Sequence, residues 1–202
     1  MNFVIAILLW FIFGLVHSLM ARPFFKKLIK LVLGDVFEKY FYRFIYFILQ
    51  CIFFYFIYGL IKNLDPGKIV FQLPEDYKII YYILYVFSNL FLITSVLQFD
   101  VAEFVGFKQM IDYFRQSKNI DIEELNNTFL YRYIRHPMYL GIILVYIFSH
   151  TVFSQMFFIN LTCIIFYVEI GSYFEEKTLI RKFGKKYDVY KTSTYKYLPL
   201  IR

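Results

Sequence analysis

Cysteine is scarce in this sequence, and its scarcity argues against two classes of protein. Only Cys51 and Cys163 occur in 202 residues. Both lie inside apolar runs, where a single cysteine behaves as a small buried hydrophobe. They provide neither a disulfide framework nor the spacing of a metal site. We therefore expect two buried thiols and no bound metal.

Glycine and proline are also few, at eight and five residues. A flexible linker or a low-complexity segment would be rich in them or in serine, and no internal repeat is present. A basic segment before the first apolar run is missing too, which is not typical of a cleaved signal peptide. The sequence predicts a single domain over 1–202 whose first apolar run is retained.

Apolar residues, by contrast, are abundant. They make up 60% of the chain, aromatic residues alone make up 24%, and a soluble domain of this length does not carry so many. Runs of about 20 apolar residues are long enough to cross a bilayer as helices. Five apolar segments are expected: about 3–20, 44–61, 79–98, 138–152 and 156–174.

The predicted fold class is therefore all-α, a polytopic membrane helix bundle of about five transmembrane helices. The segment 138–152 is short and is followed almost at once by 156–174, which predicts a C-terminal helical hairpin whose first arm need not cross the bilayer fully. Pro137 suits the first turn of that arm, because its missing N–H costs nothing there. The basic segment after Glu175 predicts an amphipathic tail on the cytoplasmic membrane surface.

The distribution of lysine and arginine predicts the orientation. These residues concentrate in 22–43, 99–136 and 175–202, whereas the loop 62–78 carries few of them and balances them with acidic residues. Because basic loops remain in the cytoplasm, we expect the N-terminus outside and the C-terminus in the cytoplasm, in a multi-pass protein of the bacterial inner membrane.

The net charge of +7 has the same explanation. The charges lie beside apolar runs, which fits contact with membrane lipids and anionic headgroups. No nucleic-acid-binding motif or stacking surface accompanies them. We therefore expect lipids and not nucleic acid as partners.

Two polar clusters point to a binding site. The first is the stretch Arg-His-Pro-Met-Tyr-Leu-Gly at 135–141, and the second is the pair Glu175 and Glu176 after the last apolar run. Arginine, histidine and tyrosine are also common anchors at a membrane interface, and a glutamate pair can be a solvated helix end. Together, however, a cationic and a carboxylate cluster can bind a zwitterionic cofactor, with stronger charged hydrogen bonds in a partly dry site.

Other polar residues give weaker signals. His17 lies near the end of the first apolar run and is either structural or able to accept a proton near neutral pH. Asp100 and Gln109 precede and follow Glu103 in a polar segment, where helix capping is the simpler interpretation. Glu169 lies within the last apolar run, and a carboxylate at membrane depth is a functional candidate.

The two clusters together carry a family resemblance. The stretch 135–141, followed by Glu175-Glu176, Phe183-Gly184, Tyr187, Tyr190 and Pro199, resembles the signature of the isoprenylcysteine carboxyl methyltransferase-like superfamily of membrane methyltransferases. The N-terminal segment 13–22 is similar to the opening of methanethiol S-methyltransferases and NnrU-type proteins, and the segment 100–109 is so more loosely. The resemblance covers most of the chain.

The resemblance implies S-adenosyl-L-methionine as the methyl donor. It assigns the cofactor pocket to the residues of the two clusters, which are His136, Tyr139, Leu140, Gly141, Glu175 and Glu176. It places His17, Asp100 and Gln109 on the substrate side. His17 and Arg135 are the candidate catalytic residues, since a histidine can take the proton of a thiol and a cation favours the thiolate that attacks.

The resemblance favours S-methylation of a small hydrophobic, methanethiol-like thiol, a lipid-soluble acceptor that a membrane site suits. Carboxyl methylation of an isoprenylated cysteine and N-methylation of a phospholipid remain alternatives within the enzyme class. A non-catalytic NnrU-type membrane accessory protein is the alternative outside it. Two residues depart from the expected pattern, Glu169 in place of an apolar residue and Val101 in place of a histidine, and both bear on the acceptor.

Overall fold

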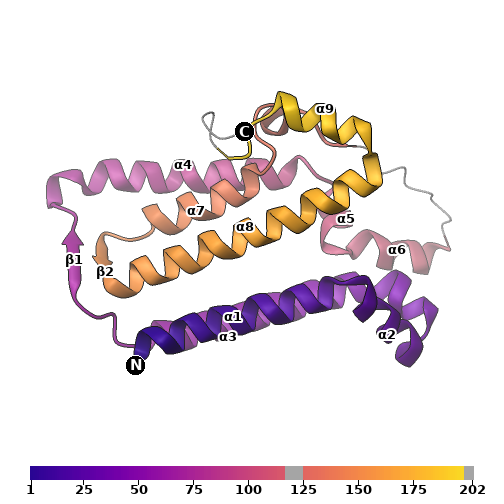
Figure 1. Cartoon of the computed structure of the whole chain (residues 1–202), viewed down its shortest axis with the longest axis horizontal. Coiled ribbons are helices and arrows are strands. Elements are labelled where there is room, and N and C mark those ends of the chain that lie inside the picture. Colours follow the sequence, from indigo (N-terminus) through magenta and orange to yellow (C-terminus); the bar gives the residue numbers. More distant parts are fainter. Residues whose placement is uncertain (117–124, 198–202) are drawn as a thin grey trace. The chain divides into compact units, whose positions relative to one another are not determined.

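The computed structural model describes residues 1–116 and 125–197, and the chain divides into two compact units. The first unit comprises 1–65 and 100–122, and the second comprises 66–99 and 123–202. Each unit is described by itself. Most of the described chain is helical (Figure 1).

The first unit is built on two long helices, α1 (Asn2–Ala21) and α3 (Tyr42–Lys62), which pack against each other. In the sequence, α1 is followed by the basic, amphipathic helix α2 (Pro23–Leu33). A turn of π-helix over Phe37–Phe41 then leads into α3. The short helices α5 (Val101–Val105) and α6 (Phe107–Arg115) complete the unit. Gly106 joins them with a φ of 87°, and a Cβ there would lie 2.5 Å from the Phe44 nitrogen, so only glycine fits this approach to α3.

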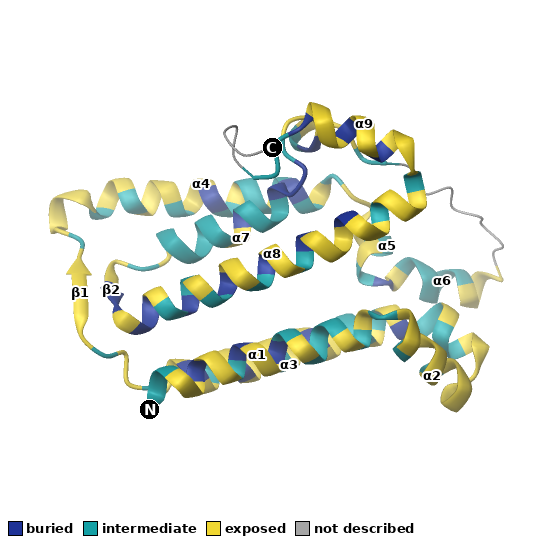
Figure 2. Ribbon diagram, in the orientation of Figure 1, coloured by how far each residue is buried: buried dark blue, intermediate teal, exposed yellow. Residues whose placement is uncertain are grey.

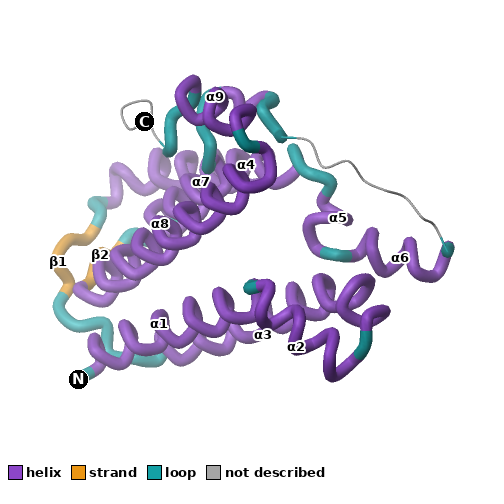
Figure 3. The backbone as a smooth tube through the Cα atoms, turned by 45° about the vertical axis from the view of Figure 1, so that its right-hand side comes forward, coloured by secondary structure: helices purple, strands orange, loops and turns teal. Residues whose placement is uncertain are grey.

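The second unit contains four helices, α4 (Lys78–Leu97), α7 (Pro137–Phe148), α8 (Gln155–Phe183) and α9 (Lys185–Ser193). Helix α7 packs along α4. Strand β1 (Ile69–Gln72) pairs antiparallel with β2 (Val152–Ser154), directly before α8, as Figure 3 shows. Ser154 caps α8 by accepting a hydrogen bond from the Phe157 N–H at 3.2 Å.

The prediction of an all-α membrane protein is confirmed. Within the described residues, four stretches are helical, long and apolar enough to cross a membrane, namely Asn2–Ala21, Phe37–Lys62, Glu75–Leu97 and Gln155–Phe183. Many of their apolar side chains are exposed on the protein surface (Figure 2). Such helices are expected to face lipid instead of a protein core.

Two of the five expected segments differ in length. The segment 138–152 forms a helix of only 12 residues, about 18 Å long at 1.5 Å per residue, which is shorter than the roughly 30 Å hydrocarbon core. The predicted 156–174 is instead a 29-residue helix that continues to Phe183, because no proline or glycine follows Gly171 before Gly184 and residues 175–182 are compatible with a helix. Glu175 and Glu176 therefore lie inside α8 and not at its end.

The expectation of two buried thiols was also wrong in part. Cys51 is exposed and Cys163 is half-buried. An apolar residue on a membrane helix can face lipid as well as protein, so apolar surroundings in sequence do not imply burial in the fold.

Candidate functional site

The two polar clusters of the sequence meet in the second unit. Arg135, just before α7, donates from Nε to Oε1 of Glu176 on α8 at 3.0 Å. His136 Nε2 lies 3.1 Å from the same oxygen. Arg135, His136 and Glu176 are 5%, 3% and 8% exposed, so this is a buried charged network formed by residues 41 and 40 positions apart.

Helix α9 and the residue after it also contact the network. Lys191 Nζ lies 2.8 Å from Glu176 Oε2. The Arg135 Nη1 donates to the backbone oxygens of Lys191 at 3.0 Å and Thr194 at 2.5 Å. The guanidinium and the carboxylate are thus held by several partners each, as a buried ion pair requires.

Backbone pairing fixes the same segments against each other. The N–H of Arg135 donates to the Tyr195 oxygen at 2.8 Å, and the N–H of His136 donates to the Lys196 oxygen at 3.2 Å. Ile134 and Tyr195 form a parallel bridge. The chain after α9 therefore lies along the segment that carries Arg135 and His136.

Glu175 differs from its neighbour in being accessible. Its carboxylate Oε2 lies 3.6 Å from His136 Nδ1, and its side chain is 44% exposed. Tyr139 stacks on the His136 ring with centroids 5.4 Å apart. Together these three residues form a carboxylate with an aromatic surface beside it, which is suited to a cationic amino group.

The other expected pocket residues have different surroundings. Gly141 faces α4, where a Cβ would lie 3.0 Å from the Leu92 Cα, so the geometry gives it a helix-packing role. Leu140 is half-buried in the first turn of α7, where its N–H donates to the His136 oxygen at 3.2 Å. Pro199, the last residue of the family signature, lies outside the described residues.

The predicted substrate-side residues all belong to the first unit. The His17 ring lies 5.7 Å from Tyr46 and 6.0 Å from Phe13. Asp100 caps α5 by accepting from the Glu103 N–H at 3.0 Å, and this hydrogen bond is the main reason that its pKa is lowered. Gln109 donates weakly to the Glu103 oxygen at 3.5 Å.

Glu169 is half-exposed and has a basic partner. Its carboxylate accepts from Lys196 Nζ at 2.5 Å, and its side chain is 46% exposed. A basic residue 27 positions later neutralises it, because the chain after α9 returns to α8. Tyr197 reinforces this return by donating to the Ser172 hydroxyl at 2.9 Å.

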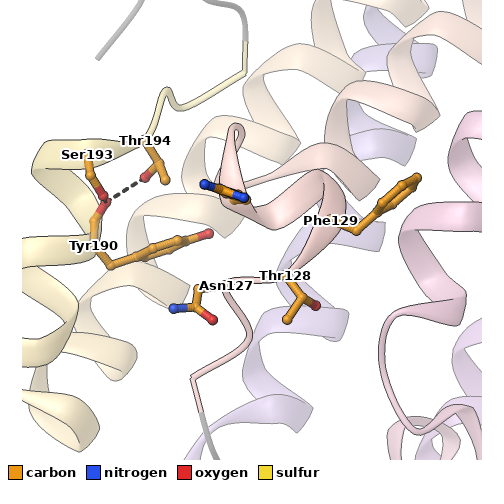
Figure 4. Close-up of a pocket in the computed structure, with 7 residues that line it drawn as sticks. Asn127, Thr128, Phe129, Tyr190, Ser193 and Thr194 are labelled. Atoms are coloured by element: carbon orange, nitrogen blue, oxygen red, sulfur yellow. Dashed lines mark hydrogen bonds between the residues drawn. The ribbon is translucent and has the colours of Figure 1, made fainter.

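A cavity of about 430 Å³ lies between the segment before α7 and the end of α9 (Figure 4). Polar and aromatic residues line it, namely Asn127, Thr128, Phe129, Arg132, Tyr190, Ser193 and Thr194. Only Thr194 links it to the buried network, through the carbonyl that Arg135 contacts. His136, Tyr139 and the glutamate pair do not line this cavity.

The sequence did not indicate three partners of the site, namely Lys191, Thr194 and Tyr197. Lys191 and Thr194 contact Arg135 through backbone oxygens, and a carbonyl group has no signature in a sequence. The ring centroids of Tyr197 and His136 are 5.9 Å apart. Within the described parts of the chain, no cluster of three or more His, Cys, Asp or Glu side chains has the arrangement of a metal site.

Comparisons with known proteins identify the family of the chain. Residues 83–186 match the family model described as phospholipid methyltransferase. A methanethiol S-methyltransferase of Pseudomonas deceptionensis is 35% identical over 106 residues, which is 50% of this chain and 37% of the relative. A methanethiol S-methyltransferase of Crocosphaera subtropica is 28% identical over 125 residues, which is 61% of this chain and 48% of the relative.

The matched part of the chain thus spans less than half the length of these two relatives. No solved structure matches the chain significantly. The family match includes α7, all of α8 and the glutamate pair, but not Lys191 and Thr194, which also contact the buried network. Because this match covers just over half of the 202 residues, the chain belongs to the phospholipid methyltransferase family.

Proposed function

We propose that this membrane protein is a methyltransferase that uses S-adenosyl-L-methionine to methylate a small hydrophobic thiol. The observation that carries the proposal is the network in which Arg135, His136 and Glu176 join the two polar clusters. That network fixes the accessible Glu175 beside His136 and Tyr139. Family membership and the names of the two relatives support the same reaction type.

The residues present fit the amino-acid end of the cofactor. Glu175 is a half-exposed carboxylate and can bind an ammonium group. The stacked rings of His136 and Tyr139 offer a surface to the adjoining sulfonium, since cations bind aromatic faces. Glu176 is already engaged by Arg135, His136 and Lys191, so it is assigned to positioning the site and Glu175 to direct contact.

When bound, S-adenosyl-L-methionine would supply a methyl group on sulfur, so that a carbon–sulfur bond to the acceptor would form as the bond to the cofactor sulfur breaks. Residues of the site hold the partners in line, and such alignment contributes about 7–11 kcal/mol to lowering a barrier. His17 is assigned to accepting the thiol proton. Arg135 is assigned to holding Glu176, because its Nε and Nη1 donors are both engaged.

Asp100 and Gln109 remain proposed substrate-side residues. Asp100 is itself held by the Glu103 N–H and by Lys108 at 3.4 Å. The Gln109 Oε1 is buried and has no hydrogen-bond partner within 1–116 and 125–197, which supports a role in binding a group outside the protein.

Two other methyl acceptors are weaker candidates than the thiol. The family description favours a phospholipid amine as the second candidate, and a carboxyl group on an isoprenylated cysteine is the third. The proposed orientation has the N-terminus outside, the C-terminus in the cytoplasm and the protein in the bacterial inner membrane, because basic residues concentrate on alternate segments.

The test is a pair of measurements on the purified protein in detergent or nanodiscs. Titration with S-adenosyl-L-methionine should give saturable binding. In a second assay, labelled cofactor is incubated with a panel of thiols, phospholipid amines and an isoprenylated cysteine. A thiol of the panel should be methylated to a methyl thioether. Cofactor binding without methyl transfer to any thiol would contradict the proposal that the acceptor is a thiol. The absence of measurable cofactor affinity would favour a non-catalytic accessory protein.

A further inference from the structure

Tyr187 is the residue of the second unit whose environment is least explained by the protein alone. It lies near the start of α9 and is only 1% exposed. Its hydroxyl is buried and has no hydrogen-bond partner anywhere in the described residues. A buried hydroxyl without a partner costs free energy, and such groups are rare in native proteins.

The neighbouring tyrosines are satisfied by the protein. Tyr190, one turn later in α9, donates to the Tyr131 oxygen at 2.6 Å. Tyr197 donates to Ser172 at 2.9 Å. Burial of phenols is thus common in this unit, but the hydroxyl of Tyr187 is left without a partner.

Tyr187 shares helix α9 with Lys191, a residue of the charged network. Burial raises the pKa of Tyr187, and Glu176 and Glu175 raise it further while Arg135 opposes them. Lys191, one turn after Tyr187 on α9, contacts Glu176 at 2.8 Å. The phenol therefore interacts electrostatically with the charged residues of the proposed cofactor site but forms no hydrogen bond with any of them in the described residues.

The cations of that site have partners within the protein. Arg135 donates to Glu176 and to the carbonyls of Lys191 and Thr194, and Lys191 contacts Glu176. An amino-acid zwitterion needs a carboxylate for its ammonium group and a donor for its own carboxylate. Glu175 meets the first need, and the hydroxyl of Tyr187 is a donor without a partner that can meet the second.

We propose that the Tyr187 hydroxyl donates a hydrogen bond to the carboxylate of the amino-acid portion of the bound cofactor. The inference rests on the proposed function, because it concerns the same site. It assigns to Tyr187 a role in recognising one chemical group, and it explains why an otherwise unsatisfied phenol is kept in the interior.

The test compares two isosteric substitutions that each remove one hydroxyl. Tyr187→Phe should leave the thermal stability of the ligand-free protein unchanged or raised, because the lost group has no protein partner. It should weaken binding of S-adenosylhomocysteine by about tenfold or more, the effect of a lost hydrogen bond to a charged group. Tyr190→Phe should do the reverse and lower stability with affinity within about twofold.

A second ligand identifies the recognised group. Decarboxylated S-adenosylmethionine keeps the ammonium and lacks the carboxylate, so wild type and Tyr187→Phe should bind it with equal affinity. Unchanged affinity of Tyr187→Phe for S-adenosylhomocysteine would overturn the inference, as would an equal loss for both ligands. Lower stability of ligand-free Tyr187→Phe would also overturn it, since the hydroxyl would then have a partner in the protein. Failure of the wild type to bind either ligand would instead remove the proposed function.

Discussion

At the scale of single residues, two adjacent glutamates have different tasks because they face different surroundings. Glu176 is 8% exposed and is surrounded by Arg135, His136 and Lys191. Glu175 is half-exposed and contacts the other nitrogen of His136. One carboxylate therefore stabilises the site, and the other is available to a ligand.

Alanine substitutions should separate these tasks. Glu176→Ala leaves the buried Arg135 without its counter-charge, so we expect a loss of about 3–5 kcal/mol in the free energy of unfolding. Glu175→Ala should change stability by less than about 1 kcal/mol and should weaken cofactor binding. Thermal unfolding with and without cofactor measures both. Equal destabilisation by the two variants would contradict the assignment.

His136 contacts both glutamates, and its loss should therefore combine the two effects. His136→Ala should weaken cofactor binding and also lower stability, because Glu176 loses one of its buried partners. Calorimetric titration of the purified variant measures the first effect. Full affinity in both His136→Ala and Glu175→Ala would remove the pocket assignment.

His17 is predicted to act on the acceptor and not on the cofactor. His17→Ala should lower the rate of methyl transfer by about 10²–10⁴-fold, the usual contribution of a general base, with cofactor affinity kept. His150→Ala is the matched control, because that histidine contacts only Ser149 and Tyr146 by the hydrogen bonds observed in the described residues. If His17→Ala failed to fold, a structural role would replace the proton-accepting one.

At the scale of elements, the short helix α7 is the part of the fold that organises the site. It begins at Pro137 directly after His136 and packs along α4 through Gly141. The sequence indicated a short segment here, and the family resemblance assigned Gly141 to the cofactor pocket. The structure places the α4 backbone at Leu92 against it, a neighbour 49 residues away that periodicity does not reveal.

Gly141→Ala tests this packing. A Cβ would lie 3.0 Å from both the Cα and the Cβ of Leu92, so the helices must separate, and we expect a loss of about 1–3 kcal/mol. Gly59→Ala on α3 is the control, since nothing lies within 4 Å of its Cβ position, and helix propensity should raise stability slightly. Chemical unfolding of both variants in detergent measures the difference, and an unaffected Gly141→Ala would exclude tight packing there.

At the scale of the whole molecule, hydropathy and charge describe the relation of the chain to the membrane. In the described residues four helices are long and apolar enough to cross it, and an orientation with the two termini on opposite sides requires the shorter apolar helix α7 as a fifth crossing. Basic residues concentrate on alternate connections. These properties add up along the chain, so they can be obtained without knowledge of contacts.

The orientation predicts the behaviour of reporters. A phosphatase fused after Leu73, in the segment between α3 and α4, should be active outside the cytoplasm, whereas the same reporter fused after Arg202 should be inactive there. A fluorescent protein fused at the C-terminus should show the opposite pattern. Phosphatase activity of the C-terminal fusion would invert the proposed topology.

The sequence by itself determined the helical membrane class, the positions of the long apolar helices and the two polar clusters, because composition, periodicity and charge are local properties. Only the tertiary structure decided that Arg135 pairs with Glu176, that Lys191 and Thr194 complete the network and that Gly141 faces α4. The network depends on how α9 and the chain after it lie against α8 and against the segment before α7. The contacts with that segment are made largely through backbone carbonyls. Every residue type has a carbonyl group, so such contacts cannot be recognised in a sequence.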